Sequence, residues 1–384
     1  MGDVVTLGKH EGIGIITIDN PPVNAMSHAM RKGLLETLRA AQADTDIEAI
    51  VLACAGRTFI AGADIKEFST GIEPPLHNDV INALELSPKP VVAAIHGTAL
   101  GGGCETTLGC HYRLATADAR LGLPEVTLGI IPGAGGTQRL PRLIGVEPAL
   151  EMITSGKPIP AARAKELGLV DEVVEGDLAE AALAFAQNLI EHAHPVRRTR
   201  NLGAEIAGTD AAVFEQARAL LAKKKAGFEA PQAAVEAVQA ATHTDFEAGL
   251  AQEQEIFLRC MMSPQSAALR YVFFAERQAS KVDDLPKDTP TRDVRTVAVL
   301  GAGTMGSGIA MCFADAGARV LLLEAGQEQL DRGVGLIKKH YESSVKKGRI
   351  KPDDAEKRVG AITPVLEYEA LADADLVVKA VFED

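Results

Sequence analysis

The chain has 384 residues, which is enough for two or three domains of ordinary size. Hydrophobic residues make up 47% and charged residues 24%, as in globular proteins, and no apolar run approaches the about 20 residues that span a bilayer. The net charge of −13 argues against nucleic acid or an anionic membrane as the main partner, because binding phosphates requires clustered lysine and arginine. We therefore expect a multidomain globular protein that inserts no segment into a membrane.

Short apolar runs alternate with helical patterns over residues 1–190. Runs bounded by Gly, Pro or Asn predict strands at Gly12–Ile18, Ala49–Cys54, Pro90–Gly97 and Tyr112–Thr116. Ser27 is the expected N-cap of a helix between the first two strands. The apolar face of that helix holds Met30, Leu34, Leu35 and Leu38. This pattern predicts an α/β domain with helices packed outside a sheet.

Strand signals are absent from Leu178 to Ser280, where the composition predicts helix alone. Aromatic residues recur at helical spacing between Ile256 and Gln278, which predicts that they lie in the core. The polar segment that follows contains two prolines and is interpreted as a linker. The predicted organisation is a core at 1–190, a helical extension at 191–280, a linker at 281–293 and a further domain at 294–384.

A glycine motif opens the last domain. Gly301, Gly303 and Gly306 form G-x-G-x-x-G between an apolar strand, Val297–Leu300, and a helix. A second strand then ends at Glu324, which completes the context of a dinucleotide-binding fingerprint. The first glycine makes the tight turn, the second admits the pyrophosphate, and the third lets helix and sheet pack closely. A carboxylate at Glu324 would bind the ribose hydroxyls and repel a 2′-phosphate, which favours NAD over NADP.

Three consecutive glycines, Gly101 to Gly103, precede Glu105 in the first domain. No Lys-Ser or Lys-Thr pair follows them, so they are not a P-loop. A helix that begins near Gly103 would offer its unpaired N–H groups to a negative oxygen, whether a phosphate or an oxyanion. Glu105 and Glu125 are candidates for catalysis, because paired carboxyl groups in a partly dry cleft can act as acid and base. Spacing alone shows no more than a candidate pair.

The same residues carry a family resemblance. The stretches that resemble the crotonase (enoyl-CoA hydratase/isomerase) superfamily are FIAGADIKEF, HGTALGGGCETTLGCHYRLATADARLGLPEVTLGIIPGAGGTQRLPRLIG and ITSGKPIPAARAKELGLVDEVV. With VAVLGAGTMGSGIA and DLVVKAVFED, the chain resembles the N-terminal half of multifunctional β-oxidation enzymes of the peroxisomal type. In these, a hydratase is joined to an NAD-dependent L-3-hydroxyacyl-CoA dehydrogenase. The resemblance implies an α/β fold: a crotonase-like ββα spiral domain with C-terminal helices, then a partial Rossmann domain.

The resemblance also implies roles for the residues around the glycine run. The backbone N–H groups of Ala63 and Gly102 would form an oxyanion hole for the thioester carbonyl of a trans-2-enoyl-CoA. Glu105 would hold and deprotonate the attacking water. Glu125 would deliver a proton to C2, or move a proton from C2 to C4 in double-bond isomerisation.

Binding residues follow from the resemblance as well. Ala61 and Lys66 are assigned to CoA. The residues assigned to NAD are Gly301, Gly303, Met305, Gly306, Glu324, Ala380 and Glu383. Lys379 stands where relatives commonly have Glu, which leaves the electrostatics near the nicotinamide open. The family's catalytic His and its Glu partner are expected beyond Asp384, so we expect a truncated domain that does not oxidise 3-hydroxyacyl-CoA.

The leading hypothesis is an enoyl-CoA hydratase of fatty acid β-oxidation with Δ3-Δ2-enoyl-CoA isomerase activity. One alternative is another thioester-enolate reaction, against which the glutamate pair argues. Another is a non-catalytic scaffold that docks a thiolase or channels acyl-CoA, which predicts a site lacking one carboxylate. Acyl-CoA substrates and a thiolase are the expected partners, and no metal is expected because no zinc-ligand spacing occurs. The N-terminus lacks signal and transit patterns, so we expect the cytoplasm in a bacterium and the peroxisome in a eukaryote.

Overall fold

The computed structural model describes residues 4–65, 67, 71, 73–279, 281–282, 284–286 and 288–381. The chain divides into two compact units, Met1–Lys281 and Val282–Asp384. No helix among these described residues is long and apolar enough to cross a membrane.

The first unit is built on a sheet with the strand order β1-β2-β3-β4-β6-β9. The strands are β1 (Val5–His10), β2 (Ile13–Ile18), β3 (Ala49–Cys54), β4 (Val91–Ile95), β6 (Tyr112–Thr116) and β9 (Glu172–Val174). Only β1 is antiparallel to its neighbour within this sheet. Side chains of β3 alternate between two cores: Ile50 and Leu52 join one, and Ala49 and Val51 the other. Because helices cover both faces, the strand is apolar throughout.

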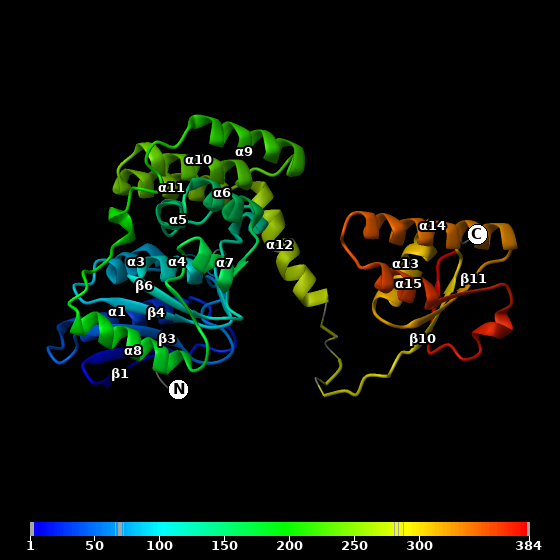
Figure 1. The fold of residues 1–384 in the computed structure, drawn as a ribbon, viewed down its shortest axis with the longest axis horizontal. Helices are drawn as coiled ribbons and strands as arrows, with labels where there is room; N and C mark the ends of the chain where they lie inside the picture. The colour runs from blue at the N-terminus through cyan, green and yellow to red at the C-terminus, as the bar shows by residue number, and fades with distance from the viewer. Residues whose placement is uncertain are drawn as a thin grey trace. The chain divides into compact units, whose positions relative to one another are not determined.

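Helices pack on the two faces of this sheet (Figure 1). Ser27 caps α1 (His28–Ala43) by accepting a hydrogen bond from the Met30 backbone N–H. The α1 face that packs into the core contains Met30, Leu34 and Leu38, all fully buried, with Leu35 partly buried beside them. Helix α8 (Leu178–Glu191) packs on the opposite face.

A smaller sheet of β5 (Thr98–Leu100), β7 (Arg120–Gly122) and β8 (Ile159–Pro160) lies beside the large one in the same unit. Its strands β5 and β7 are parallel, with Leu100 opposite Gly122. Chain segments that leave their carboxyl ends therefore start at the same edge. Strand β5 leads into α4 (Gly102–Gly109) and β7 into the 3-10 helix η1 (Glu125–Leu128).

Among the described residues, the first unit has further helices. They are α3 (His77–Glu85), α5 (Gly136–Ile144), α6 (Val146–Ser155), α7 (Ala161–Glu166), the 3-10 helix η2 (Thr199–Asn201), α9 (Ala211–Lys224), α10 (Ala230–His243), α11 (Phe246–Met261) and α12 (Pro264–Ala279). Of these, α5, α6, α9, α10 and α11 lie above α4 in the view of Figure 1. Helix α10 contacts α5, α6, α9 and α11 and so ties the helical segment to the sheet-bearing part.

The prediction that the aromatic residues of 256–278 lie in the core is wrong for α12. Tyr271 is 75% exposed and Phe274 is 37% exposed. Only the beginning of α12 packs on the unit, through buried Ser266, whose hydroxyl donates to the Leu128 carbonyl. Helical spacing therefore identified the helix but not its burial, because the second half of α12 extends past the elements that cover its start (Figure 1).

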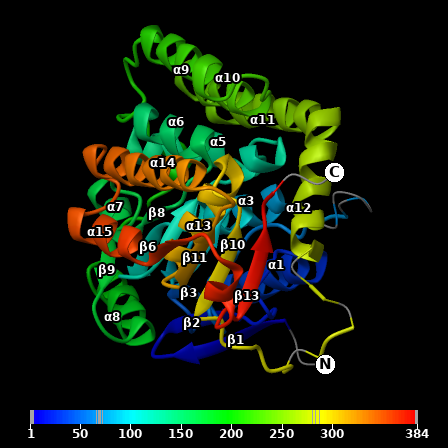
Figure 2. The ribbon, with the colours of Figure 1, turned by 90° about the vertical axis from the view of Figure 1, so that its right-hand side faces the viewer.

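The second unit is a parallel sheet with the order β12-β11-β10-β13, in which β10, β11 and β13 lie side by side (Figure 2). The strands are β10 (Thr296–Leu300), β11 (Arg319–Leu323), β12 (Ile362–Val365) and β13 (Leu376–Lys379). The helical elements are α13 (Thr304–Asp315), α14 (Gln327–Lys346), α15 (Pro352–Gly360) and η3 (Tyr368–Leu371). If these four strands are numbered 1 to 4 in chain order, their order across the sheet is 3-2-1-4. This is the order in the first part of a doubly wound dinucleotide-binding fold.

Candidate active site

The small sheet brings Glu105 and Glu125 into one cavity. Gly101, the residue after β5, donates its N–H to the carbonyl of Gly122 at the end of β7, over 2.9 Å. Glu105 then lies in the first turn of α4, and Glu125 begins η1. Both glutamates line a cavity of about 300 Å³. Residues 20 positions apart in sequence thus converge because two parallel strands end together.

Ala63 and Gly102 line the same cavity. A Cβ built on Gly102 would lie 3.6 Å from the Ala63 nitrogen, so the two backbone segments are in contact. Among the described residues, neither N–H donates to a backbone carbonyl. The N–H of Gly102 is at the start of α4, where the first four N–H groups have no partner inside the helix. Two backbone donors are therefore available to one ligand oxygen.

Glycine is required at Gly101 and at Gly103 for different structural reasons. Gly101 has φ +53°, a conformation that favours glycine, and a Cβ there would lie 3.1 Å from Oε1 of Glu125. A Cβ on Gly103 would lie 2.1 Å from the carbonyl oxygen of Ile60. Gly101 thus leaves room for a carboxyl group, and Gly103 lets α4 approach the segment that leads to Ala63.

The two carboxyl groups have different surroundings. Glu105 is 3% exposed, and its Oε1 accepts hydrogen bonds from the N–H groups of Ala134 (2.8 Å) and Gly136 (2.9 Å). Burial raises the pKa of Glu105 to about 6, although these bonds favour its ionised form. Burial and the nearby Glu105 raise the pKa of Glu125 well above its usual range. Near neutral pH the pair therefore holds an ionised Glu105 beside a protonated Glu125.

Apolar side chains form much of the cavity wall. They are Leu76, Ile130, Ile131, Phe257, Leu258 and Met261. Three buried polar atoms of this cavity lack a hydrogen-bond partner within the described chain: Nε2 of His77, Oδ1 of Asn78 and Oε2 of Glu125. Burial lowers the pKa of His77 to about 4, so its ring is neutral. These atoms are available to a bound molecule, since buried polar groups are normally paired.

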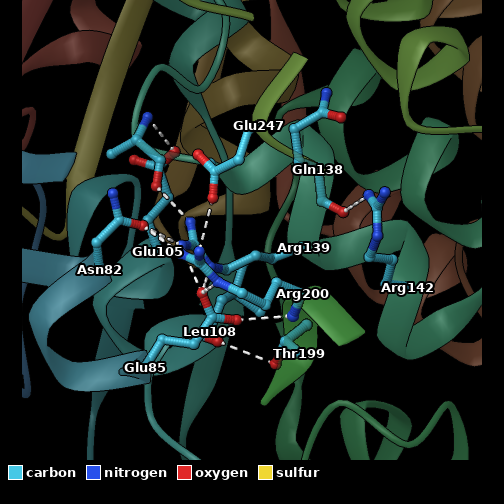
Figure 3. A network of polar contacts seen from close by, with 12 residues as sticks. Asn82, Glu85, Glu105, Leu108, Gln138, Arg139, Arg142, Thr199, Arg200 and Glu247 are labelled. Carbon is cyan, nitrogen blue, oxygen red and sulfur yellow. Dashed lines mark hydrogen bonds and ion pairs between the residues drawn. The ribbon is translucent and has the colours of Figure 1, made fainter. Parts of the chain in front are cut away.

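A buried ion cluster supports the loop that contacts Glu105, and Figure 3 shows the carboxyl group of Glu85 paired with both Arg139 and Arg200. Arg139 binds Oε2 of Glu85 at 2.8 Å and donates to the Ala134 carbonyl at 3.2 Å. Burial alone would raise the pKa of Glu85, but Arg139 and Arg200 hold it below its usual range. The loop that contacts Glu105 is therefore anchored to charged groups that must stay paired.

The structure also contains site residues that the sequence reasoning missed. His77 and Asn78 line the cavity, Arg139 supports it, and Glu253 of α11 is fully buried against the same loop. No spacing signal marked them, because each comes from an element distant in sequence. The one signal that could have marked Glu253 is its helical spacing from Leu250 and Ile256, which are buried on the same face of α11.

Of the two residues assigned to CoA, the structure describes only Ala61. Ala61 is partly buried and does not line the cavity, and its N–H donates to the Val23 carbonyl at 3.2 Å. Lys66 lies outside the described residues. Within the described parts of the chain, no group of three or more His, Cys, Asp or Glu side chains is arranged to hold a metal ion.

In the second unit, the glycine motif lies where β10, β11 and β13 end. Gly301 has φ +97°, and a Cβ there would lie 2.5 Å from the Ala380 carbonyl oxygen. A Cβ on Gly303, the N-cap of α13, would have no atom within 4 Å, whereas one on Gly306 would lie 1.8 Å from the Gly301 carbonyl. Gly301 thus makes the tight turn, Gly303 leaves an open face for a ligand, and Gly306 lets the helix pack closely.

Other residues assigned to NAD lie at the same sheet edge. Glu324 follows β11, and its Oε2 accepts a hydrogen bond from the Ala302 N–H at 2.8 Å. Ala380 follows β13 and donates its N–H to the Leu300 carbonyl. Met305 is 72% exposed in the first turn of α13. Glu383 lies outside the described residues.

Comparison with known proteins gives matches for both units. Residues 8–226 match a family model described as enoyl-CoA hydratase/isomerase. Residues 296–384 match the NAD binding domain of 3-hydroxyacyl-CoA dehydrogenase. Peroxisomal bifunctional enzymes from Cavia porcellus and Homo sapiens are 42% and 40% identical, over 97% and 98% of this chain. The match covers 52% of each of those proteins, so this chain spans about half their length.

The fold of the first unit also has a solved counterpart. The crystal structure of carnitinyl-CoA hydratase from Mycobacterium avium is similar with a TM-score of 0.55 and 27% sequence identity. The similarity covers 72% of this chain and 98% of that one.

Proposed function

Because this chain belongs to the enoyl-CoA hydratase/isomerase family, we propose that it adds water to a trans-2-enoyl-CoA and releases a 3-hydroxyacyl-CoA. One observation carries the proposal. Glu105 and Glu125 line the same cavity as Ala63 and Gly102, whose N–H groups are available to an oxygen. The cavity thus combines a base, an acid and a pair of donors for developing negative charge.

The proposed reaction uses each group once. The thioester carbonyl accepts hydrogen bonds from the N–H groups of Ala63 and Gly102, which polarises the conjugated double bond. Ionised Glu105 takes a proton from water while the water oxygen bonds to C3, and the π electron pair moves onto the carbonyl oxygen. The resulting enolate takes a proton from Glu125 at C2 as the carbonyl reforms. The pKa order of the two glutamates supports this division of roles.

We also propose Δ3-Δ2-enoyl-CoA isomerase activity for the same cavity. In that reaction the ionised form of Glu125, which its raised pKa makes the minor form near neutral pH, removes a proton from C2 and returns it to C4. Ala63 and Gly102 stabilise the dienolate between the two steps. No water is consumed, so Glu105 has no proton to take. The two reactions therefore differ in their need for Glu105, which makes them separable by mutation.

For the second unit, we propose that residues 294–384 bind NAD, with Gly301, Gly303 and Gly306 at the pyrophosphate and Glu324 at the ribose. In a longer enzyme that also carries the catalytic part of the dehydrogenase, NAD bound here would accept a hydride from a 3-hydroxyacyl-CoA. The close packing at Gly301 and Gly306 and the open face at Gly303 support this assignment. Met305, Ala380 and Glu383 remain proposed contacts, as do Ala61 and Lys66 for CoA.

The biological setting is likewise a proposal. Relatives named as peroxisomal bifunctional enzymes and as a peroxisomal fatty acid beta-oxidation multifunctional protein support a place in fatty acid β-oxidation, in the peroxisome if the organism is a eukaryote. For a bacterium we propose the cytoplasm. We propose the domain limits 1–190, 191–280, 281–293 and 294–384, and a thiolase as partner. The scaffold alternative is disfavoured because both carboxyl groups and both backbone donors are present.

The proposal is tested with the purified chain and crotonyl-CoA. We expect the absorbance of the conjugated thioester to fall and the mass of one water to be added to the product. Butyryl-CoA, which has no double bond, is the control and should stay unchanged. Crotonyl-CoA that also stays unchanged would overturn the proposed function.

A further inference from the structure

Glu253 is a fully buried glutamate of α11 whose carboxyl group is directed at the segment 134–137, which runs from the loop before α5 into the first turn of that helix. Its Oε1 accepts a hydrogen bond from the N–H of Gly135 at 2.6 Å. Its Oε2 accepts one from the N–H of Thr137 at 2.9 Å and one from the Thr137 hydroxyl at 2.6 Å. Two N–H groups and one hydroxyl group of Gly135 and Thr137 thus donate to one side chain that lies more than one hundred positions away in sequence.

Glu105 uses the other N–H groups of the same segment, 134–137. Its Oε1 accepts from the N–H of Ala134 at 2.8 Å and of Gly136 at 2.9 Å. From 134 to 137, successive N–H groups therefore point alternately to Glu105 and to Glu253. Both loop bonds of Glu105 go to Oε1, which leaves Oε2 for a water molecule in the cavity.

We propose that Glu253 is a positioning residue for Glu105: by holding the N–H groups of Gly135 and Thr137, it keeps those of Ala134 and Gly136 directed at Oε1 of Glu105. This inference rests on the function proposed above for Glu105. Glu253 itself lies beyond residues 8–226, which match the family model, so the helical segment takes part in the site.

The alternation explains why a second carboxyl group is needed. Buried backbone N–H groups require acceptors, and the two held by Glu253 lie in the protein interior. Without Glu253 these two N–H groups would have no acceptor, so the backbone from 134 to 137 would have to shift to pair them. Glycine at 135, with φ +88°, permits the tight turn but does not hold it.

Glu253 also acts on the pair through its charge. Its titratable neighbours are Glu105 and Glu125. Burial, and to a smaller extent the negative charge of Glu105, raises the pKa of Glu253 to about 8. When Glu253 is ionised, it contributes to the raised pKa of Glu125. Removing this charge should therefore lower the pKa of Glu125, the proton donor, and move the alkaline limb of the rate profile to lower pH.

The test compares Glu253→Gln with Glu255→Gln, an exposed glutamate two residues further along α11. A glutamine at 253 would face one of the loop N–H groups with its own NH₂. We expect kcat for crotonyl-CoA hydration to fall about 10²-fold, as for a small misplacement of a catalytic group, with KM changed less than about threefold. The alkaline limb of the kcat profile should move to lower pH. Thr137→Val removes only the hydroxyl bond to Glu253 and keeps both backbone N–H bonds, so its kcat should fall less than that of Glu253→Gln.

Hydrogen exchange separates this inference from the proposed function. In Glu253→Gln, amides of residues 133–138 should exchange faster than in the wild type, while the rest of the first unit exchanges as before. This readout needs no turnover, so it decides the inference even if the wild type does not hydrate crotonyl-CoA, which would overturn the proposed function alone. Exchange rates in Glu253→Gln equal to those in Glu255→Gln would overturn the positioning role. If the wild type hydrates crotonyl-CoA, a kcat of Glu253→Gln equal to the wild-type value would also overturn the positioning role.

Discussion

A methyl group added at Gly103 tests the contact that sets the spacing of the two N–H donors. A Cβ at this position would lie 2.1 Å from the carbonyl oxygen of Ile60 and 2.7 Å from the Ile60 Cβ. Ile60 is held in place because its carbonyl accepts the N–H of Leu100 at 3.0 Å. The clash is with backbone, which cannot rotate away, so α4 and the segment from Ile60 to Ala63 must separate by about 1 Å.

The size of the effect follows from this displacement. Gly103 adjoins Gly102, one donor, and Ile60 is three residues before Ala63, the other. Misplacing a reacting group by about 1 Å costs about 10²-fold in rate, and losing one such donor costs about 10² to 10³. Overpacking in a core destabilises by about 1–3 kcal/mol. We expect Gly103→Ala to lose about 10²-fold in kcat and to unfold at lower urea concentration.

The assay is crotonyl-CoA hydration, with urea unfolding followed in parallel. Gly203→Ala is the matched control, because a Cβ there has no atom within 4 Å and the residue does not have a positive φ. The control should keep the wild-type rate. A Gly103→Ala variant with wild-type kcat and stability would refute the argument that this contact sets the donor spacing.

Other predictions address the charges and the second unit. The hydration rate should follow a bell-shaped pH profile, falling below about pH 6 as Glu105 is protonated and falling again above the raised pKa of Glu125 as that acid ionises. Arg139→Met should destabilise the first unit by about 3–5 kcal/mol in urea unfolding, because it leaves the buried carboxylate of Glu85 without one of its partners. Gly306→Ala should abolish NAD binding measured by calorimetry, because its Cβ would lie 1.8 Å from a backbone carbonyl.

These predictions have their own controls. Arg163→Met removes an exposed pair with Glu166 and should change stability by less than about 1 kcal/mol. Gly308→Ala, on the same helix as Gly306, meets no atom within 4 Å and should keep NAD binding. A flat pH profile between 5 and 9, equal stabilities of the two arginine variants, or equal affinities of the two glycine variants would each contradict the corresponding prediction.

Local features of the fold could be predicted from the sequence. The predicted strands Ala49–Cys54 and Tyr112–Thr116 coincide with β3 and β6, and Ser27 caps α1. A helix was expected near Gly103, and α4 begins at Gly102. Such features depend on neighbours within a few residues, through apolar period, capping and glycine conformation. The same holds for the strand, turn and helix around Gly301.

Features that depend on distant contacts could not be predicted. The bonds of Glu253 to Gly135 and Thr137 join α11 to the start of α5, and no spacing in the sequence relates these residues. The exposure of Tyr271 depends on where covering elements end, which helical periodicity does not contain. The residues alone thus indicated a candidate glutamate pair, and the family resemblance supplied the roles of acid, base and donors, whereas the groups that hold them in place required the structure.

The most direct test of the central claim is to assay hydration of crotonyl-CoA and isomerisation of a 3-enoyl-CoA in Glu105→Gln and Glu125→Gln. The proposed roles predict that Glu125→Gln loses both reactions by about 10²-fold or more. Glu105→Gln should lose hydration by a similar factor and keep most of the isomerisation. Hydration at the wild-type rate in either variant would contradict the account, as would isomerisation that survives in Glu125→Gln.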